Sequence, residues 1–268
     1  MADPQLVVET GRIAVVRINR PEVHNALNAS VLAEIGKAHR RLTNDPVTRA
    51  IIVTGSGSRA FSAGADLAEI AELEAVEAES MLRAGGSVMS QIEQSSVPMI
   101  GAINGLALGG GFELALSLSF NISSVNASFG LPESGLGLIP GYGGTQRLAL
   151  AVGTPQALHL MLSRERLDAD RAYALGLTVA PPVAPDALMD AALRIAEAVA
   201  DGGPHANAAI LRSVRATRSA DAVGLDIEVR AAAAAISSSE GREGIAAFRS
   251  RRTPQFPDCN LREDGRGS

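Results

Sequence analysis

The chain has 268 residues, and its 24 Lys and Arg against 29 Asp and Glu give a formal net charge of −5. This acidic balance, together with 3% aromatic residues and no Trp, argues against a basic, base-stacking surface for nucleic acids. Apolar residues make up 46% of the chain, which is enough for a sizeable globular core.

No targeting or membrane-spanning pattern is visible in the sequence. Met1–Glu9 lacks the charged start and apolar stretch of a signal peptide. No apolar run reaches the roughly 18 residues that a transmembrane helix needs. We therefore expect a cytoplasmic protein without nucleic-acid or membrane partners.

Short strand patterns alternate with helical patterns in the first half of the chain. The expected strands are Leu6–Glu9, Arg12–Asn19, Ala50–Thr54, Met99–Ile103 and Phe120–Val125, with a hairpin at Gly11. The first expected helix starts with Ser30 as its N-cap and ends at Asn44–Pro46. A second covers about Leu67–Gln94, although Gly85 and Gly86 weaken the prediction that it is continuous. A third covers Gly111–Leu118. This alternation predicts βαβ units and a largely parallel sheet, hence an α/β fold.

The second half of the chain is rich in Ala and Leu and is predicted to be helical. The expected helices cover about Thr145–Val152, Pro155–Leu162, Ala169–Leu175, Asp186–Asp201, Pro204–Thr217, Ala222–Ser237 and Arg242–Arg252. We divide the chain into a core domain over residues 1–200, a helical C-terminal region over 201–256 and a disordered tail over 257–268.

Several common catalytic motifs are missing from the sequence. The four histidines are isolated, so no metal site is expected. There is no Gly-x-Ser-x-Gly elbow of a serine hydrolase. Gly109–Gly111 lacks the Lys-Ser/Thr of a phosphate loop, and Gly141–Gly144 does not match a dinucleotide fingerprint.

Three segments remain as candidates for chemistry. The first, Ala60–Leu67, is a strand-to-helix turn made of small residues. Small side chains let a ligand approach the backbone, and amides at a helix start are free to donate. An ordinary turn with Asp66 near a helix N-terminus explains the same pattern, and this alternative stays open.

The second segment is Asn104–Leu116, where Gly109–Gly111 separates a strand from an apolar helix. An amide from this turn and one from the first segment are candidates for an oxyanion hole beside a polarised carbonyl. Glu113 falls in the first turn of this helix. The apolar residues around it predict a half-buried acid with a raised pKa, although a surface carboxylate near the helix dipole remains an alternative.

The third segment, Phe129–Gly137, carries a second carboxylate, Glu133, in a loop rich in glycine and proline. Two acids and two amide donors indicate acid–base chemistry beside a carbonyl whose enolate accepts backbone hydrogen bonds. The residue pattern by itself does not bring the two glutamates together.

These segments stand in order with further motifs at Val16–Pro21, Asn25–Asn28, Gly143–Leu148 and Glu243–Phe248. Over about residues 5–256 the sequence resembles the enoyl-CoA hydratase/isomerase, or crotonase, family. The resemblance implies a crotonase-like α/β core, a spiral of ββα units, followed by a helical C-terminal region. It also implies trimers, or dimers of trimers, with residues 201–256 as the trimerisation region.

The resemblance assigns roles to the candidate residues. The amides of Ala65 and Gly110 would hold the thioester oxygen of an acyl-CoA. Glu113 would activate water and Glu133 would protonate the α-carbon, which implies reversible hydration of a trans-2-enoyl-CoA to a 3-hydroxyacyl-CoA. Coenzyme A is then part of the substrate, and no separate cofactor is expected.

Further residues are assigned to substrate and coenzyme A binding by the same resemblance: Val23, His24, Ala26, Ala63, Asp66, Leu67, Pro132, Gly141 and Arg251. Candidates for the acyl pocket are Leu67, Ile70, Met81, Met89 and Tyr142.

The chain departs from the family pattern at Glu22 and Ala68, where relatives often carry basic residues, and at Leu118-Ser119, which replaces a Cys-Asp pair. The first two departures reduce charge contacts to the coenzyme A phosphates. At the third we expect altered packing or a local hydrogen bond.

Three other functions are consistent with this pattern. A Δ3,Δ2-enoyl-CoA isomerase needs only one carboxylate, and another crotonase-family reaction is equally open. A non-catalytic acyl-CoA binder is suggested by the reduced charge contacts, but both acids are retained. The pair of glutamates favours the hydratase.

Overall fold

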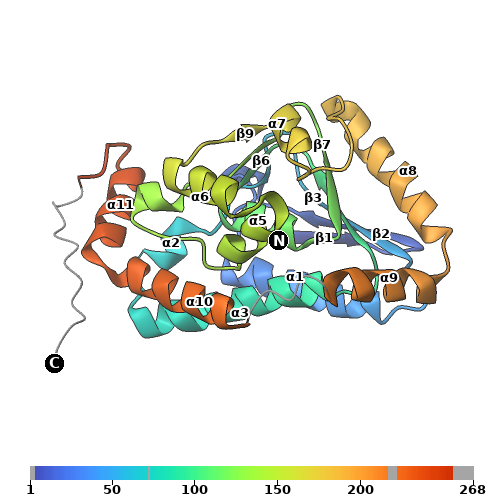
Figure 1. Cartoon of the computed structure of the whole chain (residues 1–268), viewed down its shortest axis with the longest axis horizontal. Helices are drawn as coiled ribbons and strands as arrows, with labels where there is room; N and C mark the ends of the chain where they lie inside the picture. Colours follow the sequence, from blue (N-terminus) through green and yellow to red (C-terminus); the bar gives the residue numbers. More distant parts are fainter. Residues whose placement is uncertain (1–3, 72, 217–221, 256–268) are drawn as a thin grey trace.

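The strands form two sheets in the computed structural model, which describes residues 4–71, 73–216 and 222–255 (Figure 1). The larger sheet has the order β1-β2-β3-β5-β7. Its strands are β1 (Leu6–Glu9), β2 (Ile13–Ile18), β3 (Ala50–Gly55), β5 (Met99–Ile103) and β7 (Phe120–Ser123). The β1–β2 pair is antiparallel and the other pairs are parallel, which confirms the expected hairpin and the α/β class.

The smaller sheet was not expected from the sequence. Its strands, in the order β4-β6-β8-β9, are β4 (Ala60–Ser62), β6 (Leu106–Leu108), β8 (Ser128–Gly130) and β9 (Leu167–Asp168). Strands this short show no alternation that a sequence reading detects. Because β4, β6 and β8 run parallel, the segments after their carboxyl ends meet at one edge. These are the three candidate segments.

Helices cover both sheets and form the C-terminal part. They are α1 (Ala29–Thr43), α2 (Leu67–Ile70), α3 (Ala75–Glu93), α4 (Gly110–Ser117), α5 (Gly144–Val152), α6 (Thr154–Ser163), α7 (Ala169–Ala174), α8 (Leu188–Ala200), α9 (Pro204–Ala216), α10 (Ala222–Ser237) and α11 (Ser239–Arg249). Short 3-10 helices are η1 (Pro21–Val23), η2 (Glu133–Leu136) and η3 (Pro185–Ala187). The tail predicted over 257–268 lies outside the described residues.

Several helix starts differ from the expectations by a few residues, and two of the differences are explained by caps. The N-cap of α1 is Asn28 and not Ser30, because the Asn28 side chain accepts a hydrogen bond from the Val31 amide at 2.8 Å. The helix expected over Leu67–Gln94 is divided into α2 and α3. The second begins at Ala75 because Glu74 and Glu77 form a capping box there.

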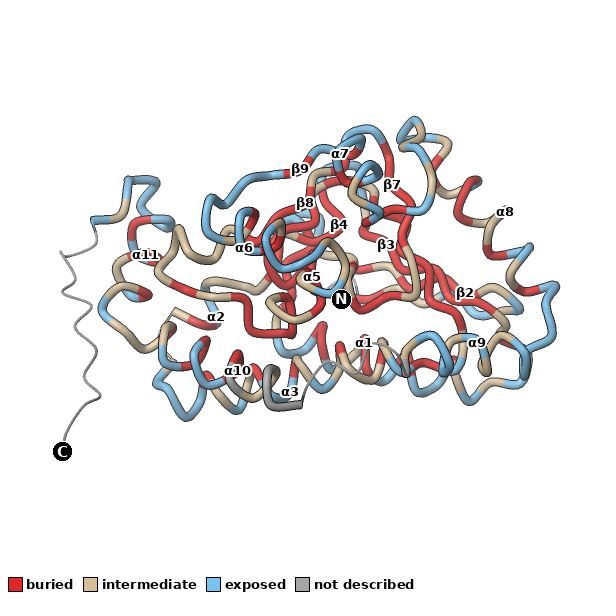
Figure 2. Tube along the Cα trace, viewed as in Figure 1, coloured by how far each residue is buried: buried red, intermediate tan, exposed pale blue. Residues whose placement is uncertain are grey.

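The larger sheet is buried on both faces (Figure 2). Val15 and Ile52 point to one face and pack in a cluster with Ala192 of α8. Their neighbours Val16 and Val53 point to the other face and belong to the larger core. This alternation along each strand places the sheet between α8 and the core that carries the candidate segments. Within the described ranges, no helix has the length and apolar character to cross a membrane.

The two consecutive glycines in α3 have different surroundings, and the helix runs through both. A Cβ at Gly85 would lie 2.4 Å from Cε1 of Tyr142, whereas a Cβ at Gly86 would meet no atom within 4 Å. Gly85 therefore lets the Tyr142 ring rest directly on the backbone of α3. Gly86 has no such packing role.

The neighbouring glycines give a matched pair of variants. We expect Gly85→Ala to destabilise the fold by about 1–3 kcal/mol through overpacking against Tyr142. Gly86→Ala should stabilise it by about 0.5–1 kcal/mol, because alanine favours the helix and fits the open space. Urea unfolding of both variants measures the difference, and equal effects at the two positions would contradict this packing.

Candidate active site

A cavity with a volume of ≈ 420 Å³ lies where the segments after β4, β6 and β8 meet. Eight of the expected site residues line it: Ala63, Ala65, Leu67, Gly110, Glu113, Pro132, Glu133 and Gly141. The C-terminal helices contribute Ile236 from α10 and Phe248 from α11 to the lining. The cavity is thus built from both halves of the chain.

The backbone amides of Ala65 and Gly110 lie close together at this cavity. Leu27 pairs with the strand-like segment around Ala65. The Leu27 amide donates to the Gly64 carbonyl at 2.8 Å, and the Leu27 carbonyl accepts from the Asp66 amide at 3.0 Å. The Ala65 N–H therefore points away from Leu27. A Cβ built on Gly110 would lie 3.5 Å from the Ala65 nitrogen. Within the described part of the chain, neither N–H donates a hydrogen bond.

Glycines shape the turn that presents the Gly110 amide. Gly109 has φ 50° and ψ −128°, a conformation that a residue with a Cβ adopts only with strain. A Cβ at Gly111, the glycine after Gly110, would lie 2.2 Å from the Ser62 carbonyl oxygen. The start of α4 therefore rests directly on β4, and Gly110 stands at the first helical position with a free amide.

Glu113 is 2% exposed, so it is more deeply buried than the half-buried acid we expected. Its Oε1 accepts hydrogen bonds from the amides of Tyr142 at 2.8 Å and Gly144 at 2.7 Å. Burial raises the pKa of Glu113 well above its usual value, and the charges of Glu228 and Glu133 raise it further. The two amide hydrogen bonds oppose this rise because they stabilise the ionised form.

Glu133 begins the 3-10 helix η2, and its Oε2 is buried without a hydrogen-bond partner in the described part of the chain. Its other oxygen, Oε1, would lie 3.0 Å from a Cβ at Gly109. Burial is the main cause that raises the pKa of Glu133 to about 7. The structure therefore brings both glutamates to one cavity, which the residue pattern left open.

Besides Glu113, Glu228 on α10 is a buried glutamate, and the sequence reading missed it. It is 3% exposed, and its carboxylate accepts hydrogen bonds from the Gly143 amide and from the amide and hydroxyl of Thr145. A signal existed in the helical period, because Glu228 stands four residues before the buried Ala232 and eight before the buried Ile236.

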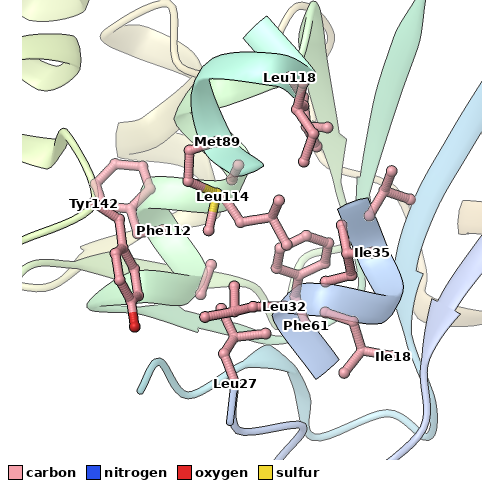
Figure 3. Packing of buried hydrophobic residues seen from close by; sticks show 14 of the residues in the cluster. Ile18, Leu27, Leu32, Ile35, Phe61, Met89, Phe112, Leu114, Leu118 and Tyr142 are labelled. Atoms are coloured by element: carbon pink, nitrogen blue, oxygen red, sulfur yellow. The ribbon is translucent and has the colours of Figure 1, made fainter. Parts of the chain in front are cut away.

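Tyr142 forms part of the cavity wall. A Cβ at Gly110 would lie 3.1 Å from its ring, on which Gly85 of α3 also packs. Tyr142, Leu67, Ile70 and Met81 line the cavity as expected for the acyl pocket. Met89 does not: it is 0% exposed and lies with Leu114 and Phe112 inside the core (Figure 3). The expectation for Met89 is wrong because its position on α3 faces the core.

Five of the expected binding residues lie outside the cavity lining: Val23, His24, Ala26, Asp66 and Arg251. The Asp66 carboxylate accepts from the Ala68 amide as the N-cap of α2 and pairs with Arg20 at 3.1 Å. This is the capping geometry that we weighed as an alternative for Asp66. His24 lines a separate surface pocket with Glu22, and Arg251 is exposed beyond the end of α11.

The departure at Leu118-Ser119 has a local hydrogen bond, as expected. Ser119 Oγ accepts from the Met99 amide at 3.0 Å, which ties the end of α4 to the start of β5. In the ranges that the structure describes, no group of His, Cys, Asp and Glu is arranged to hold a metal ion.

The chain was compared with protein families and solved structures. The family model for enoyl-CoA hydratase/isomerase matches residues 9–259. The chain is 38% identical to a crotonyl-CoA hydratase of Syntrophomonas wolfei, with 96% of this chain and 99% of that protein covered. It is 41% identical to a short-chain-enoyl-CoA hydratase of Clostridium acetobutylicum, with 75% and 77% covered.

Among solved structures, the fold is similar to an enoyl-CoA hydratase from Bacillus anthracis, with a TM-score of 0.78 and 34% identity over 94% of this chain and 99% of that chain. An enoyl-CoA hydratase/isomerase from Pseudoalteromonas atlantica gives a TM-score of 0.83 at 30% identity, covering 95% and 100%. The family match spans nearly the whole chain and includes all three segments that form the cavity. The chain belongs to the enoyl-CoA hydratase/isomerase family.

Proposed function

We propose that this protein catalyses the reversible hydration of a trans-2-enoyl-CoA to a 3-hydroxyacyl-CoA. The observation that carries the proposal is the placement of the buried Glu113 and the half-buried Glu133, whose Oε2 is buried, in one cavity with the amides of Ala65 and Gly110. Relatives named crotonyl-CoA hydratase and short-chain-enoyl-CoA hydratase support the same reaction. The reaction needs no metal or redox cofactor.

The amides of Ala65 and Gly110 hold the thioester oxygen in this proposal. As water adds to the double bond, negative charge develops on that oxygen, and two fixed N–H donors stabilise it. The donors are set by the backbone before substrate arrives, so little reorganisation is needed. Their closeness supports this role, and so does the lack of an acceptor for either N–H among the described residues.

The two glutamates divide the proton transfers. The Glu113 carboxylate takes a proton from water, whose oxygen bonds to C3 of the enoyl group. Glu133 gives its proton to C2, and the π electrons of the double bond form the new C2–H bond. The amides of Tyr142 and Gly144 support the ionised form of Glu113. The unpartnered Oε2 of Glu133 and its pKa of about 7 support a protonated form there.

The remaining candidates form the binding part of the proposal. Ala63, Leu67, Pro132 and Gly141 contact the thioester and acyl group at the cavity wall. Val23, His24, Ala26, Asp66 and Arg251 lie outside that wall and are assigned to coenzyme A. Association through residues 201–256 and the cytoplasmic location stay predictions.

Isomerisation of a 3-enoyl-CoA is the second reaction to test, because one carboxylate suffices for it. Incubation with a 3-enoyl-CoA, followed by the absorbance of the conjugated product, measures this activity. The hydratase proposal expects faster loss of the enoyl chromophore from crotonyl-CoA than conjugation of the 3-enoyl substrate. An acyl-CoA binder without catalysis would show neither change.

Glu113→Gln and Glu133→Gln test the paired acids. Each variant loses one proton-transfer step, so we expect kcat for crotonyl-CoA hydration to fall by roughly 10²–10⁴-fold. The double variant should be little worse than either single one, because the pair acts as a unit. The absorbance of the enoyl thioester follows the reaction, and near wild-type rates for both single variants would overturn the assignment.

The oxyanion amide is tested by Gly110→Pro, which deletes the N–H at a first helical position where proline is tolerated. Gly110→Ala is the matched control, because it adds a similar Cβ against Tyr142 and keeps the N–H. We expect the proline variant to have a kcat about 10²–10³-fold below that of the alanine variant. Equal rates for the two variants would remove Gly110 from the proposed site.

The protonation of Glu133 has a test that needs no substrate. Its pKa is about 7 in the folded chain against an ordinary value of 4.5, so the folded chain binds more protons between these pH values. The contribution of Glu133 to the free energy of unfolding of the wild type therefore falls as pH rises from 4.5 to about 7. Glu133→Gln does not titrate and lacks this fall.

We expect the stability of Glu133→Gln relative to the wild type to grow across that window and to level off above it. Urea unfolding at a series of pH values measures this difference. Glu243→Gln is the control, because hydrogen bonds from Arg252 lower the pKa of Glu243 to about 2. Its difference from the wild type should stay constant above pH 4.5, and the same flat profile for Glu133→Gln would contradict the raised pKa.

A further inference from the structure

The backbone from Tyr142 to Thr145 is held alternately by two carboxylates. The amides of Tyr142 and Gly144 donate to Glu113, and the amides of Gly143 and Thr145 donate to Glu228. The Thr145 hydroxyl also donates to Glu228. Successive N–H groups therefore point to opposite sides, and each side ends on a buried glutamate.

These amides belong to the start of α5, where the first N–H groups have no partners within the helix. Gly143 at the N-cap and Gly144 at the first position have no side chain that could cap these N–H groups, so the acceptor must come from another element. Glu228 supplies one from α10, a helix that packs along α3 (Figure 1).

The same segment is anchored from a second direction. Arg147 donates to the Tyr142 carbonyl at 2.6 Å and forms an ion pair with Glu93 of α3 at 2.8 Å. Arg147 is 4% exposed, so its guanidinium is buried, while Glu93 is half-buried. Arg147 thus holds the Tyr142 carbonyl of this segment, and Glu228 holds the amides of Gly143 and Thr145.

We propose that Glu228 is a positioning residue for the hydration reaction: it holds the Tyr142–Thr145 segment so that the amides of Tyr142 and Gly144 orient the carboxylate of Glu113. This inference rests on the proposed function for the role of Glu113. Glu228 itself makes its hydrogen bonds to the backbone and Thr145, and it acts through the segment rather than on the substrate.

The charge of Glu228 has a second effect on Glu113. The acidic groups that face Glu113 are Glu133 and Glu228, and both raise the pKa of Glu113. Burial raises the pKa of Glu228, and the hydrogen bonds from Thr145 and Gly143 and the charge of Arg147 oppose this rise. Arg147 is in turn paired with Glu93. Removal of the Glu228 charge should therefore lower the pKa of Glu113.

Glu228→Gln and Glu228→Asp separate position from charge. Glutamine places a donor opposite the donors Gly143 N–H and Thr145 N–H, so at least one of them loses its acceptor. Aspartate keeps the charge and shortens the reach. We expect kcat for crotonyl-CoA to fall by roughly 10²-fold in both variants, because Glu113 is misplaced, while KM changes little. Only Glu228→Gln should move the acidic limb of the pH profile to lower pH.

Asp226→Asn is the matched control, because it removes one negative charge from the same helix. Asp226 pairs with Arg83 and Arg230 at the surface. It should leave kcat and the pH profile unchanged. Wild-type kcat in Glu228→Gln, or an acidic limb that moves equally in Asp226→Asn, would overturn the positioning role.

Thr145→Val keeps the test decisive if Glu228→Gln does not fold. It removes only the hydroxyl donor to Glu228, and we expect a several-fold lower kcat with an unchanged KM. Wild-type kcat in both Thr145→Val and Glu228→Asp would overturn the proposal.

An infrared readout separates this inference from the proposed function. The carboxylic acid band that Glu113→Gln abolishes reports the protonation of Glu113 without substrate. We expect its titration to move to lower pH in Glu228→Gln and to stay in place in Asp226→Asn. An unmoved band overturns the coupling. A shift of the band in Glu228→Gln, together with no hydration of crotonyl-CoA by the wild type, would overturn only the proposed function.

Discussion

The site depends on how the free backbone donors at the start of α5 are satisfied. Buried N–H groups need acceptors, and buried carboxylates need donors. Glu113 and Glu228 meet both needs at once, because each accepts hydrogen bonds from this segment. The arrangement places negative charge at a helix N-terminus, where it is stabilised. Glu133 lacks such donors at Oε2, and this contrast gives the two acids of the cavity different environments.

The sequence predicted the larger sheet, most helices and the segments that line the cavity. Glu113 and Glu133 were found because an acid among apolar residues or glycines is unusual within a short window. Strands β4, β6 and β8 escaped detection because each has three residues. Glu228 was missed because its partners, Gly143 and Thr145, lie 85 and 83 residues away in the chain. Local patterns contain no information about such a pairing.

Met89 illustrates the same limit on a smaller scale. The sequence predicts a helix over about Leu67–Gln94, but this prediction does not say which helix face meets the cavity. Met81 lines the cavity, whereas Met89, two turns further along α3, packs beside Leu114 (Figure 3). The turn of the helix relative to α4 and α5 decides between these environments. That orientation follows from tertiary packing, including the Tyr142 ring seated on Gly85.

The position of Glu228 near the end of the chain has a consequence for biosynthesis. A ribosome releases the cavity-forming segments at residues 60–67, 104–116 and 129–145 long before it completes α10. Until then the donors at the start of α5 lack one of their two acceptors. Contacts that span more than 80 residues form late and slowly during folding. The hydrogen bonds that hold the start of α5 are therefore complete only after translation has passed residue 228.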